Sequence, residues 1–276
     1  MDLGLAGKKV IVSAATRGVG RAIAEKFLDE GATVAICGRR ARSSEPSAAD
    51  PTIHANPLGG DGVEEAVAAL SERGTVHGAV VDCGDYDAVM RWVGDAADQM
   101  GGIDIVVSSA SALGGIPRSR HGWDINYNID LMSSVAMWDA AYPHLKAAAP
   151  AAFVQISTIT AFENHTFVGS GFSYGAMKAA LINYVHQLAL EYMHEGIRCN
   201  CVCPGPIYLK GGSWDYVEQA LPDYYAANLA RQPAGRFGRP EEVANTVAFI
   251  ASERASWITG VNLTVDGGFT RNVKYG

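Results

Sequence analysis

The sequence has few charged residues and no long apolar segment. Charged side chains make up only 18% of the 276 residues and hydrophobic ones 48%, a balance typical of a compact enzyme rather than of a disordered or fibrous chain. No run approaches the roughly 18 uninterrupted apolar residues that mark a membrane-spanning helix. The first residues also lack the apolar stretch of a secretion signal. We therefore expect a cytoplasmic protein that does not bind membranes.

Clusters of lysine and arginine are missing as well, and the formal net charge is -7. Nucleic-acid binding depends on clustered positive charge, so DNA and RNA are not expected partners. Cysteine is scarce, and three of the five cysteines alternate at Cys199, Cys201 and Cys203. Alternation places side chains on one face of a strand, which we favour over a metal site. No metal is expected.

A regular alternation of strand-like and helical segments is present. Short apolar runs predict strands at 10–14, 33–37, 78–81, 103–108, 152–156 and 198–203. Longer stretches predict helices at 20–30, 63–72, 85–100, 126–146, 174–195 and 241–252. Apolar strands separated by crossover helices form parallel sheets that are buried on both faces. We therefore predict an α/β fold with a doubly wound parallel sheet, as a single domain over 1–276.

The first strand leads into a turn that contains glycine and is followed by a helix. Residues 13–20 form this turn, with Gly18 and Gly20 near its end. Such a turn lets the backbone approach a pyrophosphate, which the N–H groups at the start of the helix can bind. The alternative is that these glycines only permit a tight turn.

A tyrosine and a lysine lie four residues apart at Tyr174 and Lys178, hence on one face of a helix. A free tyrosine titrates near pH 10, and a nearby positive charge lowers this pKa. Tyr174 is therefore a candidate general acid or base. The pattern gains weight from its place after the predicted strand that ends before Ser157 and Thr158.

Together these motifs resemble those of the short-chain dehydrogenase/reductase family. In its T-G-x-x-x-G-x-G turn, Ser13 takes the Thr position and Ala14 the first Gly position. Segments 204–207, 238–244 and 265–268 match the family's later landmarks, so the resemblance spans nearly the whole chain. It implies a Rossmann-like domain that interconverts an alcohol and a ketone with a nicotinamide cofactor.

The resemblance also implies catalytic roles. Thr158 would hold the substrate carbonyl, with Ser157 and Thr160 as alternatives. Tyr174 would transfer the proton, and Lys178 would lower the Tyr174 pKa and contact the ribose. Asp130 stands where the family has an asparagine whose backbone carbonyl relays protons through water.

We expect NADP(H) to be preferred over NAD(H). Gly38 stands where members that prefer NAD carry an acidic residue, and Arg17 and Arg39 offer guanidinium groups for the additional phosphate. The loop 108–111 takes the place of the family's Asn-Asn-Ala-Gly segment and keeps only its alanine. The expected cofactor-binding residues are Ser13, Ala15, Arg17, Gly18, Val19, Gly20, Arg39, Arg40, Asp82, Cys83, Ala110, Tyr174, Lys178, Pro204, Gly205 and Ile207.

The segment at about 206–238 covers the substrate in this family and here is rich in aromatic residues. With Tyr208 and Trp214 from this segment, and Phe162 and Phe167 from the loop before Tyr174, we expect a bulky apolar substrate, such as an alicyclic, aromatic or steroid-like alcohol or ketone. The alternative is that these rings form core or subunit contacts.

Other functions remain open at this point. They are reduction of a 3-oxoacyl thioester, isomerisation or dehydration with transient use of the cofactor, and cofactor binding by a non-catalytic sensor or scaffold. The resemblance further implies a homo-oligomer, a tetramer or a dimer, that pairs the helices at 126–146 and 174–195.

Overall fold

The computed structural model describes residues 2–43, 61–112, 118–163 and 172–271. Within these ranges, seven strands form one parallel sheet in the order β3-β2-β1-β4-β5-β6-β7. The strands are β1 (Lys9–Val12), β2 (Thr33–Gly38), β3 (Val76–Val80), β4 (Ile105–Ser108), β5 (Ala151–Ile156), β6 (Ile197–Pro204) and β7 (Asn262–Val265).

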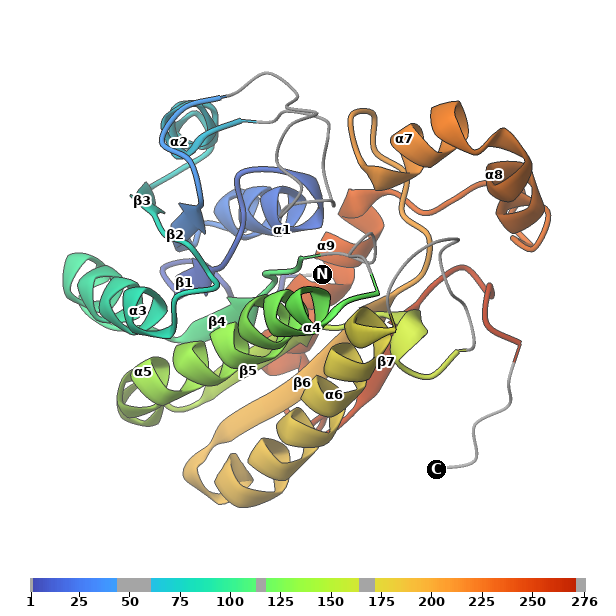
Figure 1. Ribbon diagram of the computed structural model, residues 1–276. Coiled ribbons are helices and arrows are strands. Elements are labelled where there is room, and N and C mark those ends of the chain that lie inside the picture. Colours follow the sequence, from blue (N-terminus) through green and yellow to red (C-terminus); the bar gives the residue numbers. More distant parts are fainter. Residues whose placement is uncertain (1, 44–60, 113–117, 164–171, 272–276) are drawn as a thin grey trace.

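Helices cover both faces of this sheet (Figure 1). They are α1 (Gly18–Asp29), α2 (Val63–Ser71), α3 (Tyr86–Met100), α4 (Arg120–Asn126), η1 (Tyr127–Met132), α5 (Ser133–Ala148), η2 (Ile159–Ala161), α6 (Ser173–Tyr192), η3 (Met193–Glu195), α7 (Ser213–Ala220), α8 (Pro222–Leu229), α9 (Pro240–Ala251) and η4 (Glu253–Ala255). One core lies between the sheet and α1, α2 and α9, and the other between the sheet and α3, α5 and α6. The predicted doubly wound single domain is confirmed.

The central strands are buried on both sides, as a continuous apolar run predicts. Every residue of β4, β5 and β6 is buried. Cys199, Cys201 and Cys203 share the core beneath α3, α5 and α6, so they lie on one face of β6, which confirms the strand interpretation. The described residues contain no group of acidic, cysteine or histidine side chains arranged to hold a metal ion.

Local signals explain where helices begin and end. The Asp85 side chain accepts a hydrogen bond from the N–H of Ala88 at 3.0 Å and so caps α3. Gly101 ends the helix with a φ of 73°, a conformation that glycine adopts without strain. None of the helices in the described ranges combines the length and apolarity required to cross a bilayer.

Two parts of the fold differ from the prediction. The helical region expected at 126–146 begins earlier, at Arg120, and contains the π-helical turn η1 before α5. Helices α7 and α8 and strand β7 were not predicted. In α7 and α8, aromatic residues lie at irregular spacing and pack mainly on one another, so no single apolar stripe identifies the helices.

Candidate functional site

The candidate catalytic residues meet at the carboxyl ends of the central strands. Thr158 follows β5 directly, and the next helix, α6, carries Tyr174 and Lys178 along β6 (Figure 1). In a parallel sheet of this kind, ligands bind where the strands end, because the loops that follow neighbouring strands converge there. The sheet topology thus brings together residues that are far apart in the sequence.

The hydroxyl of the half-buried Tyr174 is hydrogen-bonded to Thr158 and to Ser111. Thr158 Oγ1 also donates to Thr160 Oγ1 at 3.3 Å. The Ser157 hydroxyl instead donates to the backbone carbonyl of Lys178 at 3.1 Å. Of the three hydroxyls considered from the sequence, Thr158 is therefore the one beside the phenol, with Thr160 next to it and Ser157 committed to the backbone.

The ammonium group of Lys178 is enclosed in the protein, with only 1% of the residue exposed. Lys178 Nζ donates to the backbone carbonyls of Ala110, at 3.3 Å, and Ile156, at 3.2 Å. It also lies 3.3 Å from Oδ1 of Asp130, which is equally buried. A buried ammonium requires such partners, because desolvation of an unpaired charge is costly.

Asp130 is held by hydrogen bonds from two further groups. Its Oδ2 accepts from Nδ2 of Asn126 at 2.7 Å and from the N–H of Ala112 at 3.2 Å. The Ser173 hydroxyl in turn donates to Oδ1 of Asn126 at 2.6 Å. The π-helical turn that carries Asp130 places the carboxylate toward α6, and π-helical turns frequently occur at functional sites.

The pKa of Tyr174 lies well above its ordinary value. Burial of the phenol is the main cause, and the negative charge of Asp130 raises the pKa further, while the hydrogen bonds with Thr158 and Ser111 lower it. This direction is opposite to the depression expected from Lys178. The expectation counted the lysine charge but left out the desolvation of the buried phenol and, as a smaller effect, the Asp130 carboxylate.

The turn after β1 matches the backbone geometry that a pyrophosphate site requires. Gly18 has a φ of 62°, and a Cβ on Gly20 would lie 2.6 Å from the carbonyl oxygen of Ala14. Ala14 itself has a φ of 52°, a strained conformation for a residue with a Cβ. The first turn of α1 contains no acidic residue, and its N-cap residue, Arg17, makes no side-chain cap.

The Ser13 hydroxyl joins this turn to the loop after β4. It accepts hydrogen bonds from the N–H groups of Ser109, at 2.9 Å, and Ala110, at 3.1 Å. The N–H of Ala15 donates to the carbonyl of Cys37 at 3.0 Å, and Val19 packs against the core below α1. These contacts shape the turn around the glycines.

Positive charge gathers beside the turn. Desolvation lowers the pKa of the Arg17 guanidinium, and repulsion by Arg39 and Arg40 lowers it further. Gly38 lies directly before Arg39. A Cβ on Gly38 would lie 2.4 Å from Thr16 Cγ2, so a larger side chain at this position would have to displace its neighbours. The close-packed glycine turn and the cationic groups fit the phosphates of a dinucleotide.

The other expected cofactor residues border the same end of the sheet. Asp82 is exposed and accepts from the N–H of Gly84 at 2.8 Å, and Cys83 Sγ lies 3.9 Å from Cys37 Sγ. Pro204 ends β6, and Gly205 follows it. A Cβ on Gly205 would lie 2.6 Å from Cβ of Asp266, so this backbone also needs glycine.

The aromatic residues of segment 206–238 pack mainly on one another. Trp214 is only 6% exposed, and its ring centroid lies 4.6 Å from that of Phe237. The Tyr208 hydroxyl donates to Asp215 and Glu218, each at 2.9 Å. This packing accounts for both rings without a substrate.

The two phenylalanines expected in the substrate pocket are placed differently. Phe162 is half-buried and packs against the core on the α6 side of the sheet. Phe167 lies outside the described residues. The assignment of all four aromatic residues to a substrate pocket stays a prediction.

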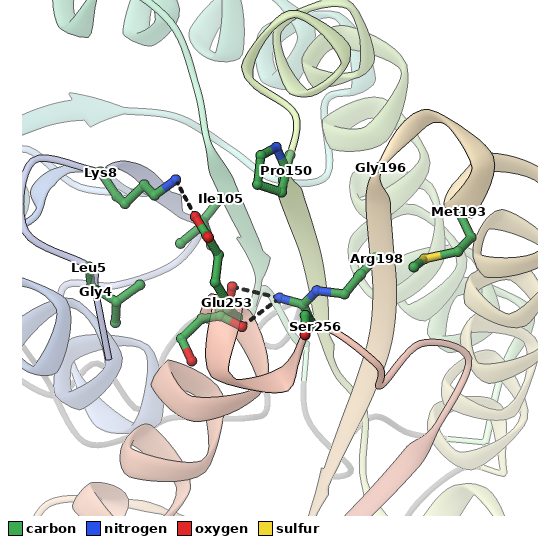
Figure 2. A pocket seen from close by; sticks show the side chains of 13 residues that line it. Gly4, Leu5, Lys8, Ile105, Pro150, Met193, Gly196, Arg198, Glu253 and Ser256 are labelled. Atoms are coloured by element: carbon green, nitrogen blue, oxygen red, sulfur yellow. Dashed lines mark hydrogen bonds and ion pairs between the residues drawn. The ribbon is translucent and has the colours of Figure 1, made fainter. Parts of the chain in front are cut away.

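A separate cavity of about 330 Å³ lies at the amino ends of the central strands, opposite the end that carries the candidate site (Figure 2). It is lined where β4, β5 and β6 begin, by Ile105, Ala151 and Arg198 among others. The Arg198 guanidinium donates to the carbonyls of Ile250, at 2.6 Å, and Ser252, at 2.8 Å. This buried arginine thus binds the end of α9, and the cavity lies away from the candidate site.

Two residues of the site were not identified from the sequence. Ser111 was noted only as part of a loop that matches the family poorly, although a hydroxyl in place of a glycine was a signal of a new polar contact. Asn126 was placed at the start of a predicted helix, and its contact with Asp130 depends on a π-helical turn that sequence periodicity does not reveal.

Comparison with known proteins agrees with this arrangement. The family model described as "Enoyl-(Acyl carrier protein) reductase" matches residues 52–270. Isoepoxydon dehydrogenase patN of Penicillium expansum is 31% identical over 97% of this chain and 96% of its own length. Dehydrogenase/reductase SDR family member 4 of Oryctolagus cuniculus is 32% identical over 96% of this chain and 94% of its own length.

Among solved structures, L-sorbose reductase of Gluconobacter frateurii, in complex with NADPH and L-sorbose, is 27% identical with a TM-score of 0.82. The match covers 99% of this chain and 100% of the sorbose reductase chain. The agreement in sequence and fold over almost the full length shows that the chain belongs to the short-chain dehydrogenase/reductase family and is an oxidoreductase that acts on CH–OH groups with a nicotinamide cofactor.

Proposed function

We propose that this protein interconverts a secondary alcohol and a ketone with NADP(H). The observation that carries the proposal is the hydrogen-bonded group formed by Tyr174, Thr158 and Ser111, with Lys178 one helical turn away. A phenol that shares hydrogen bonds with a neighbouring hydroxyl can bind a carbonyl oxygen between the two groups. The bound nicotinamide supplies or accepts the hydride.

The residues have distinct roles in this proposal. Thr158 donates a hydrogen bond that holds and polarises the carbonyl. Tyr174 gives its phenolic proton to the oxygen during ketone reduction and takes the proton back during alcohol oxidation. Lys178 keeps the loop after β4 and the end of β5 in place through its contacts with Ala110 and Ile156, and its charge acts on the phenol.

The cofactor roles follow the geometry of the turn. The N–H groups at the start of α1 bind the pyrophosphate, which the glycine positions allow to come close. Arg17, Arg39 and Arg40 bind the 2′-phosphate of NADP(H), since planar guanidinium groups match its geometry. The presence of NADPH in the complex of the related sorbose reductase is in keeping with this preference.

For the substrate, we propose a cyclic and largely apolar alcohol or ketone. The segment 206–238 offers exposed apolar side chains at Leu209, Tyr216 and Leu221. Burial of an apolar ring against such residues stabilises a complex by about 25 cal/mol per Å². The description of the matching family model adds acyl thioesters as a second class to be tested.

A panel of cyclic ketones, small polar ketones, 3-oxoacyl thioesters and the corresponding alcohols tests this proposal, with NADP(H) and NAD(H) followed by nicotinamide absorbance. We expect the highest kcat/KM for a cyclic apolar compound with NADP(H). Equal or higher kcat/KM for small polar ketones would contradict the substrate class. Product formation without a change in absorbance would instead indicate isomerisation or dehydration.

The proton-transfer role is tested by Tyr174→Phe. This change removes one titrating oxygen and little volume, so we expect turnover to fall by about a hundredfold or more with nearly unchanged cofactor affinity. Cofactor affinity is measured by fluorescence titration. Turnover within about threefold of the unaltered protein would contradict general acid/base catalysis by Tyr174.

A further inference from the structure

We infer that the carboxylate of Asp130 sets the pH range in which Tyr174 transfers its proton, so that ketone reduction runs across neutral pH and alcohol oxidation requires alkaline solution. The inference rests on the proposed function, because it needs Tyr174 as the proton-transferring group. Asp130 acts through its charge on Tyr174 and Lys178 and is thus a positioning residue. This role belongs to its side chain, not to its backbone carbonyl.

The first step concerns the charge state of Asp130. Oδ2 accepts hydrogen bonds from the Asn126 amide at 2.7 Å and the Ala112 N–H at 3.2 Å, whereas Oδ1 has no hydrogen-bond partner among the described residues and forms an ion pair with the Lys178 ammonium at 3.3 Å. The Asn126 amide is oriented by Ser173, which donates to its oxygen and leaves its NH₂ group toward Asp130. Two hydrogen bonds to one oxygen and a cation beside the other stabilise a negative charge on this carboxylate.

The second step concerns Lys178. Its ammonium group donates to two backbone carbonyls and forms an ion pair with the Asp130 carboxylate. The side chains of Lys178 and Asp130 have exposed fractions of 1% and 0%, so solvent does not screen this pair. The positive charge that would lower the Tyr174 pKa is therefore offset by a negative charge beside it.

The third step concerns the other groups around the phenol. Lys178 lies one turn further along α6, the Cys203 thiol approaches from β6, and the hydroxyls of Thr158 and Ser111 bond to the phenol. Burial of the phenol is the largest cause of its raised pKa, the hydrogen bonds with Thr158 and Ser111 favour the phenolate, and the negative charge of Asp130 opposes it. Substitution of Asp130 removes this charge and leaves the two hydroxyls in place.

The sign of the effect follows from the charge. A negative charge disfavours the phenolate, so Asp130 raises the Tyr174 pKa and its removal lowers it. Alcohol oxidation needs the phenolate as a proton acceptor and gains rate as pH rises through this pKa. Ketone reduction needs the protonated phenol and loses rate over the same range. In a plot of kcat/KM against pH, the rising limb for oxidation and the falling limb for reduction should therefore both move to lower pH when Asp130 is neutralised.

The experiment measures kcat/KM against pH in both directions, with saturating NADP(H), for Asp130→Asn. We expect both limbs to move down by about one unit, a shift of the size that removal of a nearby like charge produces. Alcohol oxidation at pH 7 should then be about tenfold faster than in the unaltered enzyme. A limb that stays in place would overturn the inference.

Asp124→Asn is the matched control. Asp124 lies on α4, in the same helical run, and pairs with the exposed Arg120 at 2.9 Å. Asp124→Asn also removes one negative charge, but this charge is exposed to solvent, where screening is strong. Both limbs should therefore stay in place. An equal shift in this control would assign the effect to net charge and overturn a specific role of Asp130.

A second variant guards against misfolding. Asparagine at 130 turns an NH₂ group toward either Lys178 or Asn126, so Asp130→Ser, which is smaller and uncharged, is measured as well and should shift the limbs in the same direction. The unaltered enzyme gives an independent result: its oxidation rate should still rise at about pH 9, and a plateau by about pH 7 would overturn the inference.

The two proposals fail differently. If Tyr174→Phe keeps its turnover, the proposed proton transfer is wrong. If Tyr174→Phe is inactive while Asp130→Asn and Asp130→Ser keep the limb positions of the unaltered enzyme, only the role of Asp130 is wrong.

Discussion

At the scale of single residues, we expect the cationic group beside the glycine turn to favour NADP(H) over NAD(H). Arg39→Ala removes one guanidinium partner of the proposed 2′-phosphate contact. A hydrogen bond to a charged group contributes about 1.5–3 kcal/mol, so KM for NADPH should rise about tenfold or more. KM for NADH should change little, because NADH lacks this phosphate.

Arg42→Ala is the control for this prediction. Arg42 is in the same basic stretch, but it is exposed and pairs with Glu64 at 2.9 Å. Its removal should leave KM for both cofactors unchanged. An equal rise of KM for NADPH and NADH in Arg39→Ala would contradict phosphate recognition by this residue.

Residue identity alone predicted part of the site. Tyr174 and Lys178 could be proposed from their four-residue spacing, and Thr158 from the resemblance to the family. The side-chain contact of Asp130 with Lys178 could not, because it joins two helices through a π-helical turn. Burial of the phenol, with the charge of Asp130 as a smaller cause, holds the pKa of Tyr174 above its ordinary value and not below it as expected.

At the scale of elements, the contact between the turn and α1 depends on one glycine. In Gly20→Ala, the new methyl group would meet backbone atoms of Ala14 and Ala15 at 2.6 and 3.2 Å, and backbone cannot move aside as a flexible side chain can. Helix α1 must therefore shift away from the turn. We expect cofactor affinity to fall about tenfold or more, measured by fluorescence titration, together with a lower Tm.

Gly94→Ala provides the comparison, since a Cβ at Gly94 on α3 meets nothing within 4 Å. Alanine is favoured over glycine in a helix interior by about 1 kcal/mol. The Tm of this variant should stay the same or rise, with unchanged cofactor affinity. A loss of affinity only in Gly20→Ala ties the effect to the turn, whereas no loss would contradict close packing there.

The predictable elements were those with a regular apolar pattern. Strands β1, β2, β4, β5 and β6 and helices α1, α2, α3, α6 and α9 are buried along continuous or periodic stretches, which is the signal that sequence analysis detects. Strand β3 has no buried residue and was predicted from its short apolar run alone. Strand β7 has no fully buried residue: its first residue is exposed and the other three are partly buried. Its place in the sheet comes from pairing with β6, and such long-range pairing leaves little trace in a local sequence.

At the scale of the whole molecule, we expect a homo-oligomer, most simply a tetramer or a dimer. Leu190 near the end of α6 is 86% exposed and Trp257 is 93% exposed, and large apolar side chains so exposed favour contacts with another surface. Light scattering at micromolar concentration should give a mass that is a multiple of 29.2 kDa. Leu190→Glu should reduce that mass if α6 contributes to the contact, and a monomeric mass for the unaltered protein would contradict the prediction.

The segment between Ile207 and Gly238 leaves and re-enters the domain at a single place. Ile207 and Gly238 form a parallel bridge, the N–H of Tyr208 donates to the Gly238 carbonyl at 2.8 Å, and the N–H of Gly238 donates to the Pro206 carbonyl at 3.0 Å. Between these ends, the aromatic rings form a small core of their own. A segment whose two ends are hydrogen-bonded to each other, and whose interior packs on itself, can be replaced as a unit. Grafting a different 208–237 segment onto the same sheet would then alter what the enzyme accepts while the proton-transferring residues keep their places.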